Sequence, residues 1–284
     1  MNLGYDELDW RGLSPRLWSR FALPEGGGFH HTASGNPAFG FFDDFLGFGG
    51  TSLDQGYYII GTGTGTVLPF DTDYDSSSAA QKLATGLGIA RFLATADDDE
   101  ALIAWGASAS EAAFKLDSSV GYGDLVFECR ILSDILLVDD WAWFAGLIEG
   151  GGQATVSCFT NAQAPASTHD QLGFLKLLAG TTAVDSYCKN QATADQGLAA
   201  IHTNVASEYV KLGFRWDSAK NVVKFYVNGV EQTSHQLNVA TITAALADSF
   251  PDDNYMTPII CVVTDQATDM TAKLDWWACA QALG

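Results

Sequence analysis

Apolar and polar positions alternate along most of this chain, as on the two faces of a β-strand. In YVKLGFRW (209–216) and VVKFYV (222–227), apolar side chains occupy every second position. Residues 217–221 supply a turn between these runs, and Asn228-Gly229 predicts a second turn because both residue types tolerate positive φ. The sequence therefore predicts a β-hairpin here, whose residues specify geometry and carry no catalytic group.

The same pattern predicts many further strands and almost no helix. Only LAAIHTN (198–204) and ATITAALADSF (240–250) have the character of short helical turns. Regularly spaced short strands of this kind indicate an all-β sandwich. In the last predicted strand, Trp276 and Trp277 point to opposite faces, which allows one of them to be exposed. The alternative is that both pack in the core. The other predicted strands lie at 38–48, 56–67, 86–96, 101–109, 111–116, 124–133, 141–150, 154–160, 172–180, 182–190, 257–264 and 271–281.

Residues 1–40 differ from the rest and form a predicted N-terminal arm, with the sandwich over 41–284. Three prolines and the glycine run 26–28 exclude a long helix, yet the arm is rich in apolar and basic side chains. One hypothesis is an extended arm that binds a partner, because Arg and Trp are enriched at interface hot spots. The alternative is an arm packed on its own domain. The candidate contact residues are Trp10, Arg11, Arg16, Leu17, Trp18, Arg20 and Phe21.

Charge and cysteine content narrow the classes of partner. The formal net charge is −20, from 34 acidic and 14 basic residues, which disfavours nucleic acid and anionic membranes as partners. The sequence has neither an apolar signal segment at its start nor a run of about 20 apolar residues. The 5 cysteines are odd in number and lack a CxxC pair, which predicts buried free thiols and folding in a reducing cytoplasm.

Three segments carry a resemblance to a known fold family. FRWDSAKNVVKFYVNGVE (214–231), the closing KLDWWACAQ (273–281) and the opening FFDDFLGF (41–48) resemble strands of the concanavalin A-like lectin/glucanase jelly roll. The resemblance implies a jelly-roll β-sandwich in which the opening strand pairs near the closing one. It spans residues 41–284 and leaves the arm unexplained.

A longer stretch resembles tailed-phage structural proteins of this fold. Residues 97–133 followed by WAWFAGLIE (141–149) reproduce their order of polar turn, strand and strand. That resemblance implies a virion structural protein, made in the host cytoplasm and placed on the capsid surface as a decoration (cement) protein or on a fibre. The implied partners are the major capsid protein or other virion proteins, with assembly as a homo-oligomer such as a trimer.

Enzymes with the fold that this sequence resembles carry a Glu-x-Asp-x-(x)-Glu run, which places their carboxylates on one face of a strand. Here Glu7-Leu8-Asp9 has no second Glu after it, and Glu128 and Glu149 have no acidic neighbour two residues away. We therefore expect no enzymatic activity, with a polysaccharide-degrading enzyme as one alternative. The other alternative is a lectin-like module that binds glycans.

Carbohydrate binding requires exposed aromatic side chains beside polar groups. Trp141 and Trp143 share one face of a predicted strand, directly after Asp139 and Asp140, and are the candidate sugar-binding residues. The alternative is that both tryptophans pack in the core of the sandwich.

A calcium site is predicted from one acidic loop. Asp71, Asp73 and Asp75 alternate as do the first ligands of a calcium-binding loop. However, Ser76 stands in place of the turn glycine and Lys82 in place of the bidentate glutamate. The alternative is a solvated acidic loop without a cation, and no other cofactor is expected.

Overall fold

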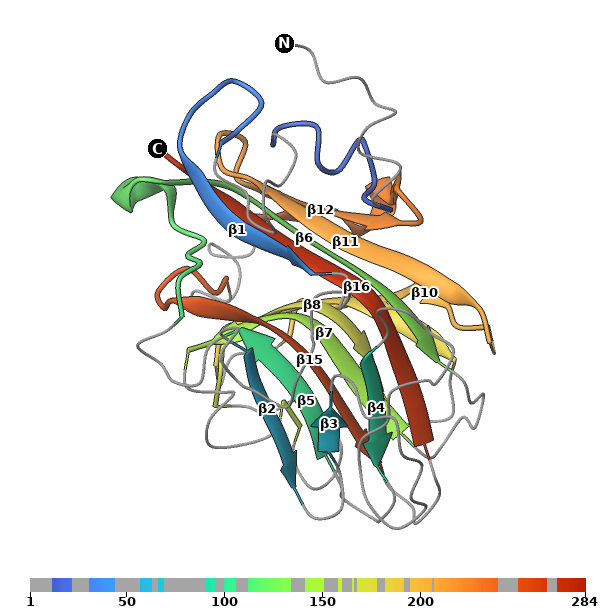
Figure 1. Cartoon of the computed structure of the whole chain (residues 1–284). Coiled ribbons are helices and arrows are strands. Elements are labelled where there is room, and N and C mark those ends of the chain that lie inside the picture. Colours follow the sequence, from blue (N-terminus) through green and yellow to red (C-terminus); the bar gives the residue numbers. More distant parts are fainter. Residues whose placement is uncertain are drawn as a thin grey trace.

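A computed structural model of the chain shows a sandwich of two antiparallel β-sheets (Figure 1). Within the described part of the chain, no helix is long and apolar enough to cross a membrane. The described residues include two short 3-10 helices, η2 (Ser118–Val120) and η3 (Thr233–His235). The structure describes residues 12–21, 31–43, 57–62, 66–68, 90–94, 100–105, 112–133, 141–150, 158–159, 165, 168–177, 182–191, 195–205, 207–239, 250–264 and 270–284.

The first sheet, here called the arm-side sheet, has 9 strands among these residues. β1 (Ala38–Asp43) pairs with β16 (Met270–Leu283), and β14 (Leu237–Asn238) pairs with β12 (Val222–Val227). The order across the sheet is β13 (Val230–Glu231), β12, β11 (Tyr209–Asp217), β6 (Tyr122–Ser133), β16, β4 (Ala90–Ala94) and β3 (Thr66–Leu68).

The second sheet, here called the opposite sheet, has 7 strands among the described residues. The figures show it as the other layer of the sandwich (Figure 1). Its order is β10 (Leu198–Thr203), β9 (Ala183–Lys189), β8 (Gln171–Lys176), β7 (Trp141–Glu149), β15 (Met256–Thr264), β5 (Glu100–Trp105) and β2 (Tyr57–Thr62).

Strand alternation sorts side chains between the core and the outer faces of the sandwich. On β6, Leu125 and Phe127 point into the core between the sheets, whereas Val126 and Glu128 point outward. Trp276 and Trp277 diverge in the same way, as predicted, but both are buried. Neither is exposed, in line with the alternative of core packing, because the arm covers the outer face where Trp276 lies.

The predicted hairpin and the predicted pairing of the first and last strands are confirmed. β11 and β12 pair in register from Leu212↔Val227 to Asp217↔Val222. Asn228 (φ 49°) and Gly229 (φ 76°) form the tight turn after β12. β1 runs antiparallel to β16, with Asp43 opposite Trp277. The fold is therefore the concanavalin A-like jelly-roll sandwich that the sequence predicts.

Two local predictions are wrong. Residues 198–203 form the edge strand β10 and not a helical turn, with a register shift against β9 and Ala200 at φ 60°. The predicted strand at 111–116 is reduced, in its described part, to a single bridge between Phe114 and Met256. The 5 cysteines are buried and form no disulfide, as predicted.

Candidate functional site

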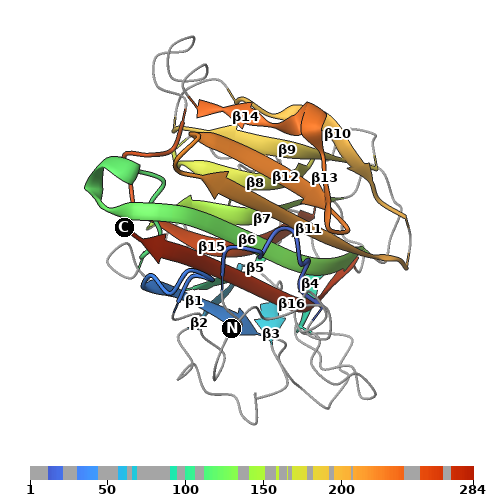
Figure 2. The same ribbon diagram turned by 90° about the horizontal axis from the view of Figure 1, so that it is seen from above.

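Residues 12–21, here called the arm segment, pack on the outer face of the arm-side sheet. Figure 2 shows the segment lying over β11, β6 and β16. Ser14-Pro15 begins a single tight turn, in which the Trp18 amide donates to the Ser14 carbonyl at 3.1 Å. The turn directs apolar side chains down onto the sheet. The resulting cluster consists of Leu13, Leu17, Trp18 and Phe21 from the segment, with Ala38, Val126, Tyr226, Trp276, Ala278 and Ala280.

The carboxylate of Glu128, in β6, fixes the arm segment from below. It is buried and accepts hydrogen bonds from the Ser14 amide (3.0 Å), the Ser14 hydroxyl and the Trp18 indole Nε1 (2.7 Å). Burial raises the pKa of this carboxyl, and the bonds from Ser14 and Trp18 oppose that rise. Nearby, Lys211 Nζ donates to the Gly12 carbonyl at 3.3 Å. The sheet therefore provides polar as well as apolar anchors for the segment.

Arg20 closes the other end of the arm segment. Its guanidinium bridges Asp124 of β6 and the buried Asp217 of β11, with 3.1 Å to Asp217 Oδ2. Asp124 also accepts from the Ser218 amide and hydroxyl, both at 2.9 Å. Because one guanidinium faces two carboxylates, this corner carries no surplus of positive charge.

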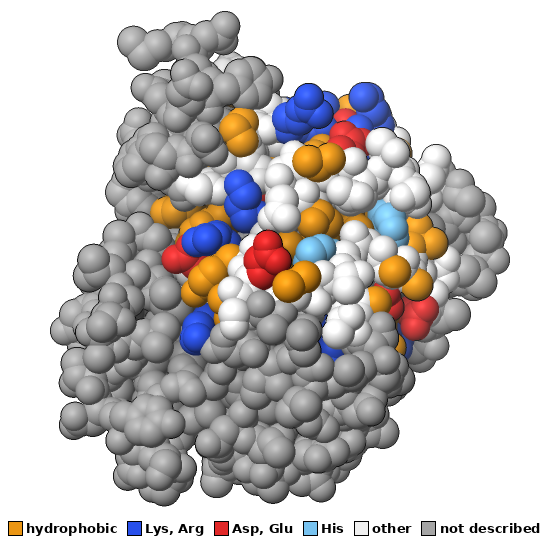
Figure 3. Space-filling model, turned by 90° about the vertical axis from the view of Figure 1, so that its right-hand side faces the viewer, with side chains coloured by type: hydrophobic (Ala, Val, Ile, Leu, Met, Phe, Trp, Pro, Cys, Tyr) orange, Lys and Arg blue, Asp and Glu red, His pale blue; other side chains and the backbone are white. Residues whose placement is uncertain are grey.

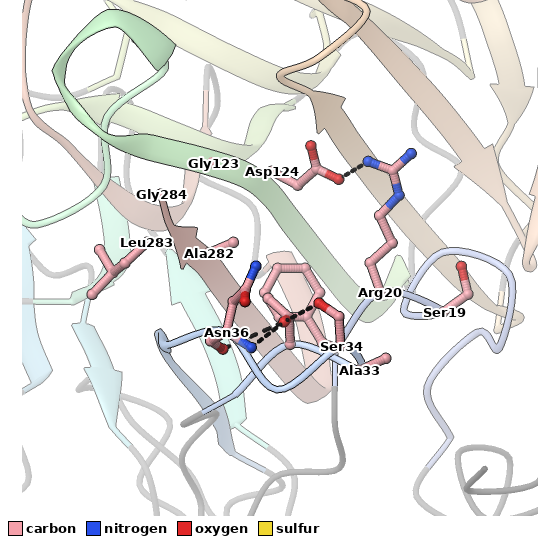
Figure 4. A pocket seen from close by; sticks show the side chains of 12 residues that line it. Ser19, Arg20, Ala33, Ser34, Asn36, Gly123, Asp124, Ala282, Leu283 and Gly284 are labelled. Carbon is pink, nitrogen blue, oxygen red and sulfur yellow. Dashed lines mark hydrogen bonds and ion pairs between the residues drawn. The ribbon is translucent and has the colours of Figure 1, made fainter. Parts of the chain in front are cut away.

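A pocket of about 380 Å³ opens between the arm and the end of the sandwich (Figure 4). Small-molecule sites span roughly 300–1,000 Å³, so this one suits a small ligand. Its lining is rich in hydroxyl, amide and charged groups. The carboxamide of Asn36 is exposed and makes no hydrogen bond with the described residues, so it is free to bind a ligand. The lining residues are Ser19, Arg20, Phe21, Thr32, Ala33, Ser34, Asn36, Gly123, Asp124, Ala282, Leu283 and Gly284.

Two tyrosines lie beside the pocket and form an aromatic surface. Tyr122 pairs with the pocket residue Leu283 across β6 and β16, and its ring meets the Tyr255 ring edge-on at 6.0 Å. Tyr255 is 46% exposed, and Lys115 Nζ lies 5.4 Å from the centre of its ring. Val120 and Leu283 are also exposed here, so apolar surface is concentrated at this end.

A carboxylate cluster adjoins Tyr255 on the opposite sheet. Asp170 is buried, accepts from the Gln191 amide (3.0 Å) and from Asn254 Nδ2 (3.3 Å), and its own amide donates to Glu149 Oε2 (3.3 Å). Burial raises the pKa of Asp170 to about 6, with a further rise from the Glu149 charge and a partial reversal by the bond from Asn254. The cluster links the ends of β7 and β9 to the starts of β8 and β15.

Stability is expected to depend on the protonation of Asp170. Its folded pKa of about 6 exceeds the unfolded value of about 3.9, so between these values the native state binds more protons. The stabilisation of the folded state by protonated Asp170 is complete below about pH 4. It is lost as the pH rises through about 6, which lowers the free energy of unfolding by about 1–2 kcal/mol. Urea denaturation from pH 4 to 8 should show this fall in the wild type and a flatter profile in Asp170→Asn. Identical profiles for the two proteins would contradict the assignment.

The predicted arm residues divide into two groups in the structure. Leu17, Trp18 and Phe21 are buried on the chain's own sheet, so this conformation offers none of them to a partner. Here the alternative of an arm packed on its own domain holds. Arg16 is exposed and Arg20 lines the pocket. Trp10 and Arg11 lie outside the described residues, and the boundary at residue 40 stays a prediction.

The predicted sugar-binding tryptophans are not at the surface. Trp141 and Trp143 are buried in the core between the sheets, which corrects their assignment as stacking residues. The run WAWFAGLIE is buried on both of its faces, so alternation alone did not show which face would be exposed.

The predicted calcium ligands Asp71, Asp73 and Asp75 lie outside the described residues, as do Glu7 and Asp9. Within the described ranges, no group of at least three His, Cys, Asp or Glu side chains could hold a metal ion. The calcium hypothesis therefore stays a prediction from the sequence.

Sequence reasoning missed the residues that line the pocket, lie beside it or hold the arm. Glu128, which binds the arm, has no acidic neighbour two residues away in VFECR, and Asn36, Asp124, Tyr122 and Tyr255 belong to no motif. One signal was present in the sequence: Glu128 is a lone glutamate within an apolar strand, and a carboxylate that is buried there requires hydrogen-bonding partners. Nothing in the sequence indicated that these partners would lie in the arm.

Figure 3 shows the side at the right of Figure 1, where the described apolar side chains form small groups among polar and charged ones. The described residues on that face form no broad apolar area.

Comparison with known proteins supports the fold. No protein-family model matches the sequence, and no curated protein sequence matches it. An endo-β-1,3-glucanase from Pyrococcus furiosus has a similar structure, with TM-score 0.54, 10% identity, and coverage of 92% of this chain and 99% of that one. An endo-1,3-β-glucanase from Streptomyces sioyaensis matches with TM-score 0.51 and 13% identity, over 93% of this chain and 99% of that one. The metal-free carbohydrate recognition domain of Emp46p matches with TM-score 0.52 and 9% identity, over 83% of this chain and 93% of that one.

These structures correct one expectation from the sequence. The chain was expected to lack enzymatic activity, but endo-1,3-β-glucanases share its fold across nearly its whole length. The missing Glu-x-Asp run is therefore insufficient to exclude glycosidase activity. At 9–13% identity the likeness establishes the concanavalin A-like fold alone.

Proposed function

We propose that this chain binds carbohydrate at the pocket between the arm and the end of the sandwich. The observation that carries the proposal is the exposed Tyr255, with the half-buried Tyr122 against it, beside a polar pocket with a free carboxamide. Carbohydrate recognition combines these elements, because aromatic rings contact the apolar faces of sugar rings while polar groups bond their hydroxyls. The fold shared with two glucanases and a carbohydrate recognition domain is consistent with this function.

The charges around the pocket favour an uncharged sugar. Arg20 is held between Asp124 and Asp217, so it has no unpaired positive charge to offer an acidic ligand. The formal net charge of −20 adds a general repulsion of anions. We infer that neutral oligosaccharides bind better than uronic acid-containing ones.

Binding is tested by titrating a panel of oligosaccharides into the protein in a calorimeter, with a β-1,3-linked glucose trisaccharide as the first probe. Tyr255→Ala should weaken binding about tenfold, corresponding to about 1.4 kcal/mol for the loss of one aromatic contact. Val205→Ala is the matched control, because Val205 is exposed but lies at the far edge beyond β10. Equal affinity in the wild type and Tyr255→Ala would refute the tyrosine surface as the site.

Glycoside hydrolysis is a second candidate function. It is favoured by two adjacent carboxyl groups, Glu149 at the end of β7 and Asp170 directly before β8, of which Asp170 has a pKa raised to about 6. A general acid needs a pKa near the working pH. Release of reducing ends from a soluble β-1,3-glucan tests this role. Activity that survives Glu149→Gln would exclude the pair.

The virion role predicted from the sequence rests on the resemblance alone. It brings with it a capsid or other virion partner, a homo-oligomer and a capsid-surface location, none of which the described residues test. Stoichiometric co-purification of the polypeptide with assembled particles would support it. A glycan-binding module on a particle surface would reconcile that role with the pocket.

A further inference from the structure

The arm contributes a large part of the pocket lining. Residues 19–21 and 32–36 form one wall, and the start of β6 with the end of β16 forms the other (Figure 4). The two arm portions also bind each other. The Ala33 amide donates to the Arg20 carbonyl at 2.7 Å, and Phe21 forms an isolated antiparallel β-bridge with Thr32. The pocket therefore has its observed shape only while the arm segment is docked on the sheet.

Docking of the arm segment depends on a buried carboxylate that lies outside the pocket. Glu128 is not among the pocket-lining residues, yet it accepts three hydrogen bonds from Ser14 and Trp18. A buried carboxylate is costly without such partners, so removing the arm leaves Glu128 either hydrated or unsatisfied. The adjacent Gly213 leaves space for the arm, because a Cβ there would lie 2.4 Å from Leu17 Cδ2.

We propose that Glu128 is a positioning residue for the carbohydrate site, because its carboxylate docks the arm and the docked arm completes the pocket. The ligand part of this inference rests on the proposed function, whereas the docking part stands on the contacts alone. Arm docking and sugar binding are then thermodynamically linked, and each favours the other by the same factor.

The linkage sets the size of the expected effect. A ligand that binds only the docked form has an apparent dissociation constant equal to the intrinsic one divided by the docked fraction. If Glu128→Leu lowers the docked fraction to about one tenth, sugar affinity falls about tenfold although no pocket residue has changed. Glu128→Gln keeps one oxygen acceptor and should lose less affinity, which makes it the conservative rescue.

The test combines trypsin cleavage of the full chain with calorimetric titration of the β-1,3-linked glucose trisaccharide. Cleavage between Arg16 and Leu17 reports undocking, because Leu17 is buried and neither residue lines the pocket. Glu128→Leu should speed this cleavage, which follows the undocked fraction, and weaken binding, which follows the docked fraction. Glu128→Gln should lie between it and the wild type in both measurements. The exposed Glu208→Gln is the control and should change neither.

In the wild type, saturating trisaccharide should slow the same cleavage, a measurement that stands even if Glu128→Leu fails to fold. Unchanged cleavage in the presence of bound sugar would overturn the linkage. So would a Glu128→Leu protein that is cleaved after Arg16 as fast as the urea-unfolded chain, and so has a largely undocked arm, yet binds with wild-type affinity. If the wild type binds no sugar, the proposed function fails, and the cleavage rates alone still decide whether Glu128 docks the arm.

Discussion

Trp18→Ala is expected to lower the free energy of unfolding by about 3–5 kcal/mol, the usual range for truncating a buried aromatic side chain. Trp18 is 0% exposed and packs edge-on against Phe21 with ring centres 6.0 Å apart. Its indole also donates to Glu128 at 2.7 Å, so the substitution leaves a buried carboxylate with one donor fewer. The change therefore removes apolar contact and a charged hydrogen bond together.

Urea denaturation of the full chain measures this effect. Arg16→Ala, in the same turn but exposed, is the matched control and should stay within about 0.5 kcal/mol of the wild type. A loss below about 1 kcal/mol for Trp18→Ala would mean that the arm adds little to the fold, against the packing described here.

Trp277→Ala is also expected to lower the free energy of unfolding by about 3–5 kcal/mol. This loss comes from the core between the sheets and not from the arm. Trp277 lies between the sheets, where its ring meets Phe41 edge-on at 4.9 Å, and Phe41 stacks on Trp105 at 4.4 Å. The cavity would therefore sit where β16, β1 and β5 meet.

The neighbouring Trp276 supplies the contrast. It faces the arm segment, so Trp276→Ala should chiefly speed trypsin cleavage after Arg16, whereas Trp277→Ala should chiefly lower the denaturation midpoint. If both variants showed the same balance of cleavage and midpoint changes, the separation of the two apolar clusters would be wrong.

The parts of the fold that the sequence predicted are those where local signals agree. The β11–β12 hairpin combines alternation in both strands with a short polar turn. In the next turn, from β12 to β13, Asn228 and Gly229 both adopt positive φ. Residues 198–203 lack that agreement, because an alanine-rich run has little β preference and owes its extended form to pairing with β9. Tertiary pairing of this kind leaves no local trace.

The candidate site was harder to predict for a different reason. Its groups come from the arm, the start of β6, the end of β16 and the turn before β15, which no local pattern connects. The aromatic residues that the sequence singled out, Trp141, Trp143 and Trp18, are buried, while Tyr255 at a strand start is exposed. Alternation identifies a strand, but whether a second layer covers its outer face depends on distant parts of the chain.

The arm thus has a structural role even without an external partner. It buries the outer face of the arm-side sheet, satisfies Glu128 and forms one wall of the pocket. A partner that competed for Leu17, Trp18 or Phe21 would have to displace these contacts and would open the pocket. Partner binding through those residues and sugar binding would then oppose each other.

Backbone hydrogen exchange with and without the β-1,3-linked glucose trisaccharide tests the central claim most directly, because it locates the ligand on the chain. We expect slowed exchange at the amides of residues 32–36, 122–124 and 282–284, which border the pocket, and at Tyr255 beside it. The amides of β10, at the far edge of the opposite sheet, should be unchanged. Protection confined to the opposite sheet, or no protection at any concentration, would contradict a carbohydrate site between the arm and the sandwich.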